Sequence, residues 1–383
     1  MATNYENFQN LDLDENLLKG IYMYGFKSPS KIQVKGIKTI TNNNDCILQS
    51  QSGTGKTATY LLSIINNYLK TSKKTIVLSP TRELAIQIYE VAKSLTKYLN
   101  INICLTIGGI HFHQNTKDIK KAHIIIGTIG RINHMIKYYM ENDTVLLKDF
   151  NVIVFDEADN ILENGISNEI KNITGNMKDN KQTILISATL SQNVFDYSTK
   201  HMNDVKKVLL KRTQIAVDLI SQFYIDTEVE ENKFGVMMDL YSILPTTQTI
   251  IFCNTIRKLD WLEKELKKEN FTITCIHGKM NQEERNQIVK EFRDGKTRVL
   301  LTTDILARGI DIPQVNLVIN YDLPINKETY IHRIGRCGRF GKKGVSISLI
   351  NFQDYKDNQQ YKRFKNHYQM EIKEMPNNIS DYL

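Results

Sequence analysis

The sequence predicts an α/β protein with two tandem domains, each built on a parallel sheet flanked by helices. Its 383 residues exceed what one ordinary hydrophobic core accommodates. Short apolar runs repeat along the chain, and each leads through a polar or glycine-containing turn into a helical spacing of apolar residues. This alternation is typical of doubly wound α/β folds. We expect domains over residues 1–211 and 220–383, joined by a linker at 212–219.

Composition and charge narrow the functional classes without choosing one. The net charge is +8, from 50 basic and 42 acidic residues, which permits binding to a polyanion but does not require it. The five cysteines are scattered and form no Cys-x-x-Cys pair, which argues against a zinc site or a disulfide framework. No apolar run approaches the roughly 20 residues of a membrane span, and the N-terminus lacks a signal pattern. We therefore expect no membrane partner.

A phosphate-binding loop is the first functional motif. A short buried strand, residues 45–49, leads into Gly-x-Gly-Lys-Thr, and a helix is expected over 58–68. The glycines expose backbone N–H groups to a triphosphate, and the helix N-terminus favours its negative charge. Lys56 is expected to reach the β- and γ-phosphates and Thr57 to bind Mg²⁺. Serine stands at position 50, where the consensus has glycine, and a chance glycine-rich turn is the alternative. The predicted nucleotide-binding residues of the loop are Ser52, Gly53, Thr54, Gly55, Lys56 and Thr57.

An acidic strand end is the partner of that loop. Residues 152–155 form a buried apolar run, and Asp156, Glu157 and Asp159 follow at once. Unpaired carboxylates beside an apolar core are costly, and a bound cation or phosphate chemistry relieves that cost. The alternative is a strand that runs into a solvated acidic loop. Beside a phosphate loop, Asp156 is expected to complete the Mg²⁺ site and Glu157 to orient and deprotonate the attacking water.

The remaining predicted strands of the first half also end in polar or glycine-rich turns. Each turn alone could serve only to end its strand. Together, at one edge of one sheet, the turns offer backbone and hydroxyl donors that suit the binding of phosphates. These strands are residues 75–79, before Pro80–Ala85; 103–107, before Gly108-Gly109; 123–126, before Gly127–Arg131; and 183–186, before Ser187–Thr189.

The second half repeats the alternation but contains no phosphate loop of its own. A strand is expected at 249–255 and a helix at 258–269, with Trp261 and Leu262 in the core, whereas 204–219 shows no clear strand register. Residues 330–341 carry three arginines at three-residue spacing, which on a helix would share nearly one face. A surface basic stripe is the alternative. Arginine stabilises charge on a transferring phosphoryl group, so we expect the two halves of one monomer to close over one nucleotide.

These motifs, taken in order, resemble the DEAD-box RNA helicases, and most closely the group of eukaryotic initiation factor 4A. The resemblance covers residues 8–383. The segments that carry it are Gly25–Gln33, Ser50–Thr57, Pro80–Ala85, Gly108-Gly109, Thr128–Arg131, Asp156–Asp159, Ser187–Thr189, Ile251–Thr255, Gln282 with Arg285, Thr302–Asp311 and His332–Arg339.

The resemblance implies two RecA-like domains that bind ATP with Mg²⁺ and single-stranded RNA. It implies that Gln33 reads adenine, that Phe8 stacks on it, and that Asp311 meets the ribose side. Arg336 and Arg339 would act as arginine fingers. Residues that would link nucleotide closure to RNA are Asp159, Ser187, Thr189 and His332. Residues that would line the RNA groove are Thr81, Arg82, Gly109, Thr128, Arg131, Asn254, Arg285, Thr302 and Asp304. Contacts to the RNA backbone predict little base specificity.

One departure stands out, because Ile129 replaces the proline of the family's Thr-Pro-Gly-Arg segment. A looser loop and weaker RNA affinity are expected, since proline fixes φ. The leading functional hypothesis is an RNA-stimulated ATPase that unwinds short duplexes in translation initiation. The alternatives are an ATP-gated RNA clamp like the exon-junction relative, or a helicase of ribosomal RNA processing. We expect initiation-factor or exon-junction proteins as partners and a cytoplasmic location, with the nucleus and nucleolus as alternatives.

Overall fold

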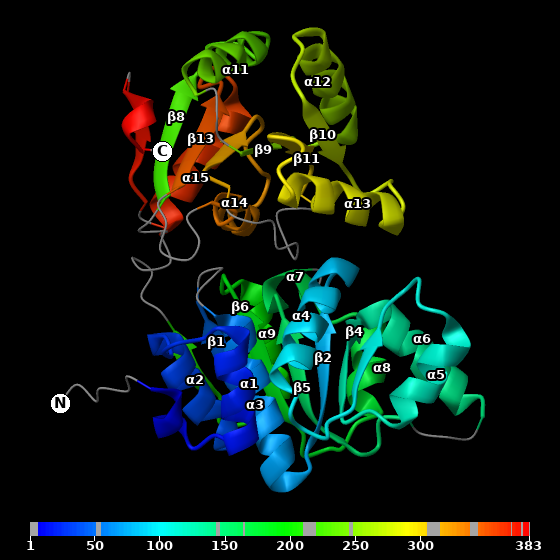
Figure 1. Ribbon diagram of the computed structural model, residues 1–383. Helices are drawn as coiled ribbons and strands as arrows, with labels where there is room; N and C mark the ends of the chain where they lie inside the picture. Colours follow the sequence, from blue (N-terminus) through cyan, green and yellow to red (C-terminus); the bar gives the residue numbers. More distant parts are fainter. Residues whose placement is uncertain are drawn as a thin grey trace, which may run out of the picture. The chain divides into compact units, whose positions relative to one another are not determined.

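The computed structural model divides into two compact units, and the boundary falls between Leu209 and Ile220 of the described chain (Figure 1). The predicted linker, 212–219, lies outside the described residues. The structure describes residues 7–50, 55–142, 146–163, 165–209, 220–244, 248–304, 315–337, 344–368, 370–376 and 378–382. Within these ranges, no helix has the length and apolar character needed to cross a membrane.

The first unit is a seven-stranded parallel sheet with the strand order β3-β4-β2-β5-β6-β1-β7. Its strands are β1 (Cys46–Gln49), β2 (Lys74–Ser79), β3 (Ile103–Thr106), β4 (Ile124–Thr128), β5 (Phe150–Asp156), β6 (Gln182–Ser187) and β7 (Lys206–Leu209). Its helices are η1 (Phe8–Leu11), α1 (Glu15–Tyr24), α2 (Lys31–Thr41), α3 (Lys56–Thr71), α4 (Arg82–Leu95), α5 (Phe112–Lys120), α6 (Ile129–Met140), α7 (Ala158–Ile161), α8 (Asn168–Gly175) and α9 (Gln192–His201).

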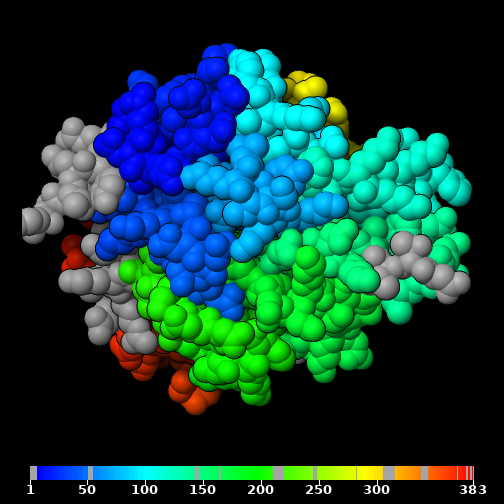
Figure 2. Space-filling view, turned by 90° about the horizontal axis from the view of Figure 1, so that it is seen from below, coloured from blue at the N-terminus to red at the C-terminus, as the bar shows by residue number. Residues whose placement is uncertain are grey.

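Alternate residues of the strands in the first unit face two separate apolar cores. Val152 and Val154 pack with helices α1 to α4, whereas Ile153 and Phe155 pack with α5, α6, α8 and α9. Both faces of the sheet are therefore covered, which is why its strands are continuous apolar runs. Figure 2 shows the dark blue N-terminal helices beside the light blue to cyan end of α4. There Gly20 allows the close approach, because a Cβ on it would lie 2.2 Å from the carbonyl oxygen of Leu95.

The second unit repeats the first, with the strand order β10-β11-β9-β12-β13-β8-β14 and parallel pairing throughout. Its strands are β8 (Ile220–Asp226), β9 (Thr249–Phe252), β10 (Ile273–Ile276), β11 (Val299–Thr302), β12 (Leu317–Asn320), β13 (Gly344–Ile350) and β14 (Ile372–Glu374). Its helices are α11 (Asn232–Ile243), α12 (Ile256–Lys268), α13 (Gln282–Arg293), α14 (Lys327–Ile334), α15 (Tyr355–Tyr368) and η2 (Ile379–Tyr382). The predicted fold class, two tandem RecA-like sheets flanked by helices, is confirmed.

Three local predictions were wrong. Residues 206–209 form edge strand β7, within the segment 204–219 where the sequence showed no clear strand register. The side chains of this strand are largely exposed, so it lacks the buried apolar run that predicts a strand. Trp261 is 45% exposed and packs edge-on against Phe234, whereas its neighbour Leu262 is buried as expected. Helix α14 ends at Ile334, so Arg336 does not continue its helical face.

Candidate functional site

The polar residues predicted to act on nucleotide lie at the carboxyl ends of the strands of the first unit. Strand β1 leads toward Gly55 and Lys56, with which α3 begins, while β5 ends at Asp156. Strand β6 pairs with both β1 and β5, so these two chain segments lie one strand apart. Parallel strands place their carboxyl ends at the same edge, which is where α/β sheets bind ligands. Ser52, Gly53 and Thr54 lie outside the described residues.

The start of α3 is arranged for close contact with neighbouring groups. Gly55 has φ of +90°, a left-handed conformation that favours glycine. A Cβ at this position would lie 2.6 Å from Gln33 Nε2, so the glycine also makes room for that side chain. Lys56 Nζ donates a hydrogen bond to the carbonyl oxygen of Ser50. The lysine ammonium is thus held beside the end of β1.

Gln33 lies beside that loop and is oriented by its own helix start. The N-cap of α2 is Ser30, so the helix begins at Lys31. Gln33 Oε1 accepts a hydrogen bond from the Ser30 backbone N–H at 2.7 Å, in a capping box. The side chain is 4% exposed. Because the box fixes the oxygen, the amide nitrogen is presented toward Gly55, in keeping with a role in reading a base.

Asp156 is a buried carboxylate with both oxygens already in hydrogen bonds. Its Oδ1 accepts from the Glu157 backbone N–H at 2.9 Å, and its Oδ2 accepts from the Tyr60 hydroxyl at 2.8 Å. Burial, and secondly the charge of Glu157, raise the pKa of Asp156 to about 6. Glu157 itself has a left-handed backbone, with φ of +53°. Such strain in a non-glycine residue is typical of functional positions.

No cluster of three or more His, Cys, Asp or Glu residues capable of enclosing a metal occurs in the described ranges. Mg²⁺ binds proteins through one or two carboxylates and takes its other ligands from water and substrate phosphates. Asp156 and the hydroxyl of Thr57 supply oxygen donors of this kind, and the cost of burying Asp156 would fall beside a cation. The residues present therefore fit a divalent cation held jointly with a nucleotide.

A second buried network links the acidic strand end to the end of β6. The Thr189 hydroxyl donates to Asp159 Oδ2, and the Ser187 hydroxyl donates to the Thr189 carbonyl oxygen. All three side chains are at most 4% exposed. The structure therefore brings together three of the four residues predicted to couple nucleotide to RNA. The fourth, His332, is buried in the second unit.

The predicted RNA-binding residues of the first unit gather around two basic side chains. A Cβ on Gly108 would lie 2.6 Å from the Arg82 guanidinium. Arg131 donates to the carbonyl oxygen of Ile110 at 2.8 Å and stacks on Phe112 at 5.2 Å. Their contacts, at Gly108 and at Ile110 two positions later, place the two cations close together. Burial, and secondly the charge of Arg82, lower the pKa of Arg131. Residues that accompany them at this edge are Thr81 and Thr128, the N-caps of α4 and α6, and the exposed Gly109.

Arg333 organises the corresponding edge of the second unit, and the sequence did not single it out for this role. It is fully buried, and its Nε donates to Asp304 Oδ1 at 2.6 Å, while Nη1 donates to the Asp322 carbonyl at 2.7 Å. Its Nη2 donates to Asn254 Oδ1 at 2.8 Å. Asn254 in turn donates to the Leu323 carbonyl at 2.8 Å. Two predicted RNA-binding side chains are thus fixed by one arginine.

Other predictions in the second unit have mixed outcomes. Arg336 is 3% exposed and donates to the His332 carbonyl at 3.3 Å, so it is not part of a surface stripe. Arg285 is partly exposed on α13. Asp311 and Arg339 lie outside the described residues.

Two predicted contacts are contradicted by burial. Phe8 is 0% exposed and packs in the first core, 6.2 Å from Phe26, so it presents no face to a base. Phe26 is the partly exposed aromatic ring of this segment, and the sequence reading missed it. Thr302 is also 0% exposed, because it ends strand β11, which is paired on both sides by β10 and β9, and its hydroxyl donates to the Thr303 carbonyl. Its side chain does not line a groove.

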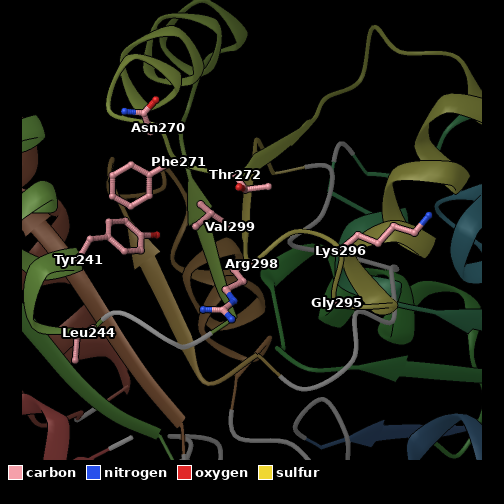
Figure 3. Close-up of a pocket in the computed structure, with 9 residues that line it drawn as sticks. All are labelled: Tyr241, Leu244, Asn270, Phe271, Thr272, Gly295, Lys296, Arg298 and Val299. Carbon is pink, nitrogen blue, oxygen red and sulfur yellow. The ribbon is translucent and has the colours of Figure 1, made fainter.

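A cavity of about 440 Å³ lies at the opposite edge of the second sheet (Figure 3). Figure 3 shows the rings of Tyr241 and Phe271 on one side of it and Arg298 nearby. Its lining residues precede β10 and β11 rather than follow them. None of the described residues predicted to bind nucleotide or RNA lines this cavity.

Comparisons with known proteins agree with this arrangement. Residues 30–197 match the family described as DEAD/DEAH box helicase, and residues 232–341 match the helicase conserved C-terminal domain. Eukaryotic initiation factor 4A from Caenorhabditis elegans is 44% identical over 99% of this chain and 93% of its own length. The ATP-dependent RNA helicase FAL1 from Scheffersomyces stipitis is 43% identical over 99% of this chain and 94% of its own.

Solved structures give the same result. Dbp5 from S. cerevisiae, bound to RNA and ADP BeF3, superposes with a TM-score of 0.86 at 34% identity, covering 98% of this chain and 97% of its own. Mss116p bound to single-stranded RNA and AMP-PNP superposes with a TM-score of 0.84 at 27% identity, covering 97% of this chain and 79% of its own.

Proposed function

Because the chain belongs to the DEAD/DEAH box helicase family, we propose that it uses ATP to separate short RNA duplexes locally, without moving along them. The protein is an ATP-dependent RNA helicase of the type of eukaryotic initiation factor 4A and FAL1, and it hydrolyses ATP. The observation that carries the mechanism is the position of Lys56, Asp156 and Glu157 at one edge of one sheet. A phosphate-loop helix and an acidic strand end there serve phosphoryl transfer.

Mg²⁺ is proposed as the cation, held through Thr57 and Asp156 together with the ATP phosphates. When bound, it neutralises charge on the β- and γ-phosphates. Lys56 leaves the Ser50 carbonyl and binds the phosphates, since an ammonium forms a stronger hydrogen bond with an anion than with a neutral carbonyl. Gln33 binds the adenine, and the partly exposed Phe26, rather than Phe8, is the ring proposed to stack on it.

Glu157 is proposed to orient the attacking water and accept its proton. Glu157 follows the end of β5 directly and is the N-cap of α7, with a left-handed backbone. Arg336 and Arg339 are proposed to stabilise the charge that develops on the transferring phosphoryl group. Arg336 has the required rigidity, because it is buried and hydrogen-bonded to the His332 carbonyl.

RNA is bound as a single strand through its sugar-phosphate backbone, with little base specificity. In the first unit, the paired cations Arg82 and Arg131 support this, because two nearby positive charges attract a phosphate. In the second unit, Asn254 and Asp304 are proposed to contact the strand in the orientation that Arg333 gives them. The 2′-hydroxyl of RNA would distinguish it from DNA.

Translation initiation is the proposed cellular process, supported by the 44% identity to eukaryotic initiation factor 4A. Helicases named FAL1 match equally well, at 43–44%, so identity alone does not separate the two groups. A cytoplasmic location and scaffold proteins from the initiation machinery are proposed with it. Proteins that co-purify with the chain from its source cells test this choice: initiation factors would support it, while exon-junction or nucleolar proteins would overturn it.

The biochemical proposal is tested with a short labelled RNA duplex and purified protein. Repeated ATP turnovers with release of the separated strands are the expected result. A complex with RNA and an ATP analogue that persists only in the presence of partner proteins, without strand release, would instead identify an ATP-gated clamp. The two outcomes differ in one observable, the number of duplexes released per protein molecule.

A further inference from the structure

Tyr60 is the residue whose position the mechanism does not yet explain. It lies on α3, three positions after Thr57, so the two side chains share one face of the helix. Its relative exposure is 0%, and its ring packs in the first core among apolar side chains. A phenylalanine would fill that space equally well. The hydroxyl is thus the feature that requires an explanation, because burying one without a partner is costly.

The hydroxyl has a defined partner 96 positions away in the chain. It donates to Asp156 Oδ2 at 2.8 Å, and the other oxygen of that carboxylate accepts from the Glu157 backbone N–H at 2.9 Å. Two donors on different oxygens fix both the position and the rotation of the carboxylate plane. Each carboxylate oxygen has a second lone pair, so both can still accept a further ligand.

The same hydroxyl belongs to the helix that carries the second proposed cation ligand, Thr57. Burial, and then the charge of Asp156, raise the pKa of Tyr60 well above its ordinary value, while an interaction with the Thr57 side chain lowers it. The phenol therefore remains a donor at any physiological pH. Thr57 and Asp156 belong to different motifs, and Tyr60 connects them, because it donates to Asp156 and lies about one turn after Thr57 on α3.

We propose that Tyr60 is a positioning residue for the divalent-cation site, in which its hydroxyl holds Asp156 beside the face of α3 that carries Thr57, in the arrangement that binds Mg²⁺ with nucleotide. This inference rests on the proposed function, because it assumes that these two residues bind the cation. Residues that orient metal ligands typically contribute 10–100-fold to metal affinity. A preordered carboxylate loses less conformational freedom when the cation binds.

The test is the Mg²⁺ dependence of ADP binding by the full chain carrying Tyr60→Phe. Fluorescent ADP is titrated with protein in EDTA and then at increasing Mg²⁺ concentrations. We expect the half-saturating Mg²⁺ concentration to rise about tenfold, with ADP affinity in EDTA unchanged within about twofold. If the hydroxyl had a purely structural role, its removal would lower the stability of the protein without changing the half-saturating Mg²⁺ concentration.

Tyr139→Phe is the matched control, since it removes another largely buried hydroxyl bond in the same unit, to the Thr116 carbonyl at 2.6 Å. The control should leave the Mg²⁺ dependence unchanged. An unshifted Mg²⁺ requirement in Tyr60→Phe, with wild-type protein responding normally, would overturn this inference alone. If wild-type protein bound ADP equally in EDTA and in Mg²⁺, the proposed cation site would fail as well. A shift of the same size in both variants would also refute a specific role for Tyr60.

Discussion

Replacing Arg333 should destabilise the second unit and misplace two RNA-binding side chains at once. Arg333→Met keeps most of the aliphatic volume but removes the guanidinium, which donates to Asp304, the Asp322 carbonyl and Asn254. It also removes the stacking on Phe252, which lies 5.1 Å from the guanidinium carbon. All three acceptors thus lose the same donor group.

The size of the effect follows from the exposure of each acceptor. Removing one partner of a buried ion pair costs about 3–5 kcal/mol. Here the Asp304 side chain is 47% exposed, so water replaces much of that bond and the lower end of the range applies. The Asp322 carbonyl left without this donor adds about 1–3 kcal/mol. We therefore expect the free energy of unfolding of the second unit to fall by about 4 kcal/mol, the sum of the lower ends of the two ranges.

Trp261 allows this loss to be measured in the full chain. It is the single tryptophan, it lies on α12 of the second unit, and it is packed against Phe234. Urea unfolding followed by tryptophan fluorescence thus reports mainly on that unit. Arg363→Met, at an exposed position on α15, is the control and should change stability by less than about 0.5 kcal/mol. A loss below 1 kcal/mol for Arg333→Met, or unchanged RNA affinity, would refute the reasoning.

Three further outcomes are expected. Asp156→Asn should stabilise the nucleotide-free protein above pH 7 by up to about 3 kcal/mol. The pKa of Asp156 is raised to about 6 in the folded protein. Protonation of this acid therefore stabilises the fold fully below about pH 4, and the stabilisation is lost as the pH rises through 6. Thermal unfolding in EDTA should therefore show Asp156→Asn to be more stable than the wild type at pH 8, with this difference in stability disappearing near pH 4. An equal difference at both pH values would contradict this. Gly127→Ala should destabilise the first unit by about 2 kcal/mol in thermal unfolding, because its Cβ would lie 2.1 Å from the Thr106 carbonyl oxygen; a neutral effect would mean that β3 and β4 can separate. Ile129→Pro should raise RNA affinity with nucleotide affinity unchanged, since Ile129 is the first residue of α6, where proline is well tolerated; titration with labelled RNA would refute this by showing no change.

The sequence predicted those features that depend on local order along the chain. Strand, turn and helix alternate with a clear apolar pattern, so both sheets and the edge that holds Lys56 and Asp156 were predictable. Edge strand β7 was not, because its exposed side chains carry no burial signal. Phe8 was misplaced for a similar reason, since its burial depends on how the N-terminal helices pack on α3 and α4.

The residues missed by the sequence act through contacts between distant segments. Tyr60 reaches Asp156 across 96 positions, and Arg333 reaches Asn254 across 79. A tyrosine in an apolar helix, or one arginine among three, has no local feature that distinguishes such a bond from simple packing. Only the folded sheet, which brings α3 to the end of β5 and α14 to the end of β9, defines these pairs.

RNA-stimulated ATP hydrolysis by Glu157→Gln is the most direct test of the proposed mechanism. The substitution keeps the size of the side chain and one acceptor oxygen but removes the base, so ATP and RNA binding should persist. We expect the RNA-stimulated rate to fall by about 10²–10⁴-fold, the usual contribution of a positioned general base. Hydrolysis at the wild-type rate, with the same stimulation by RNA, would contradict the assignment of Glu157.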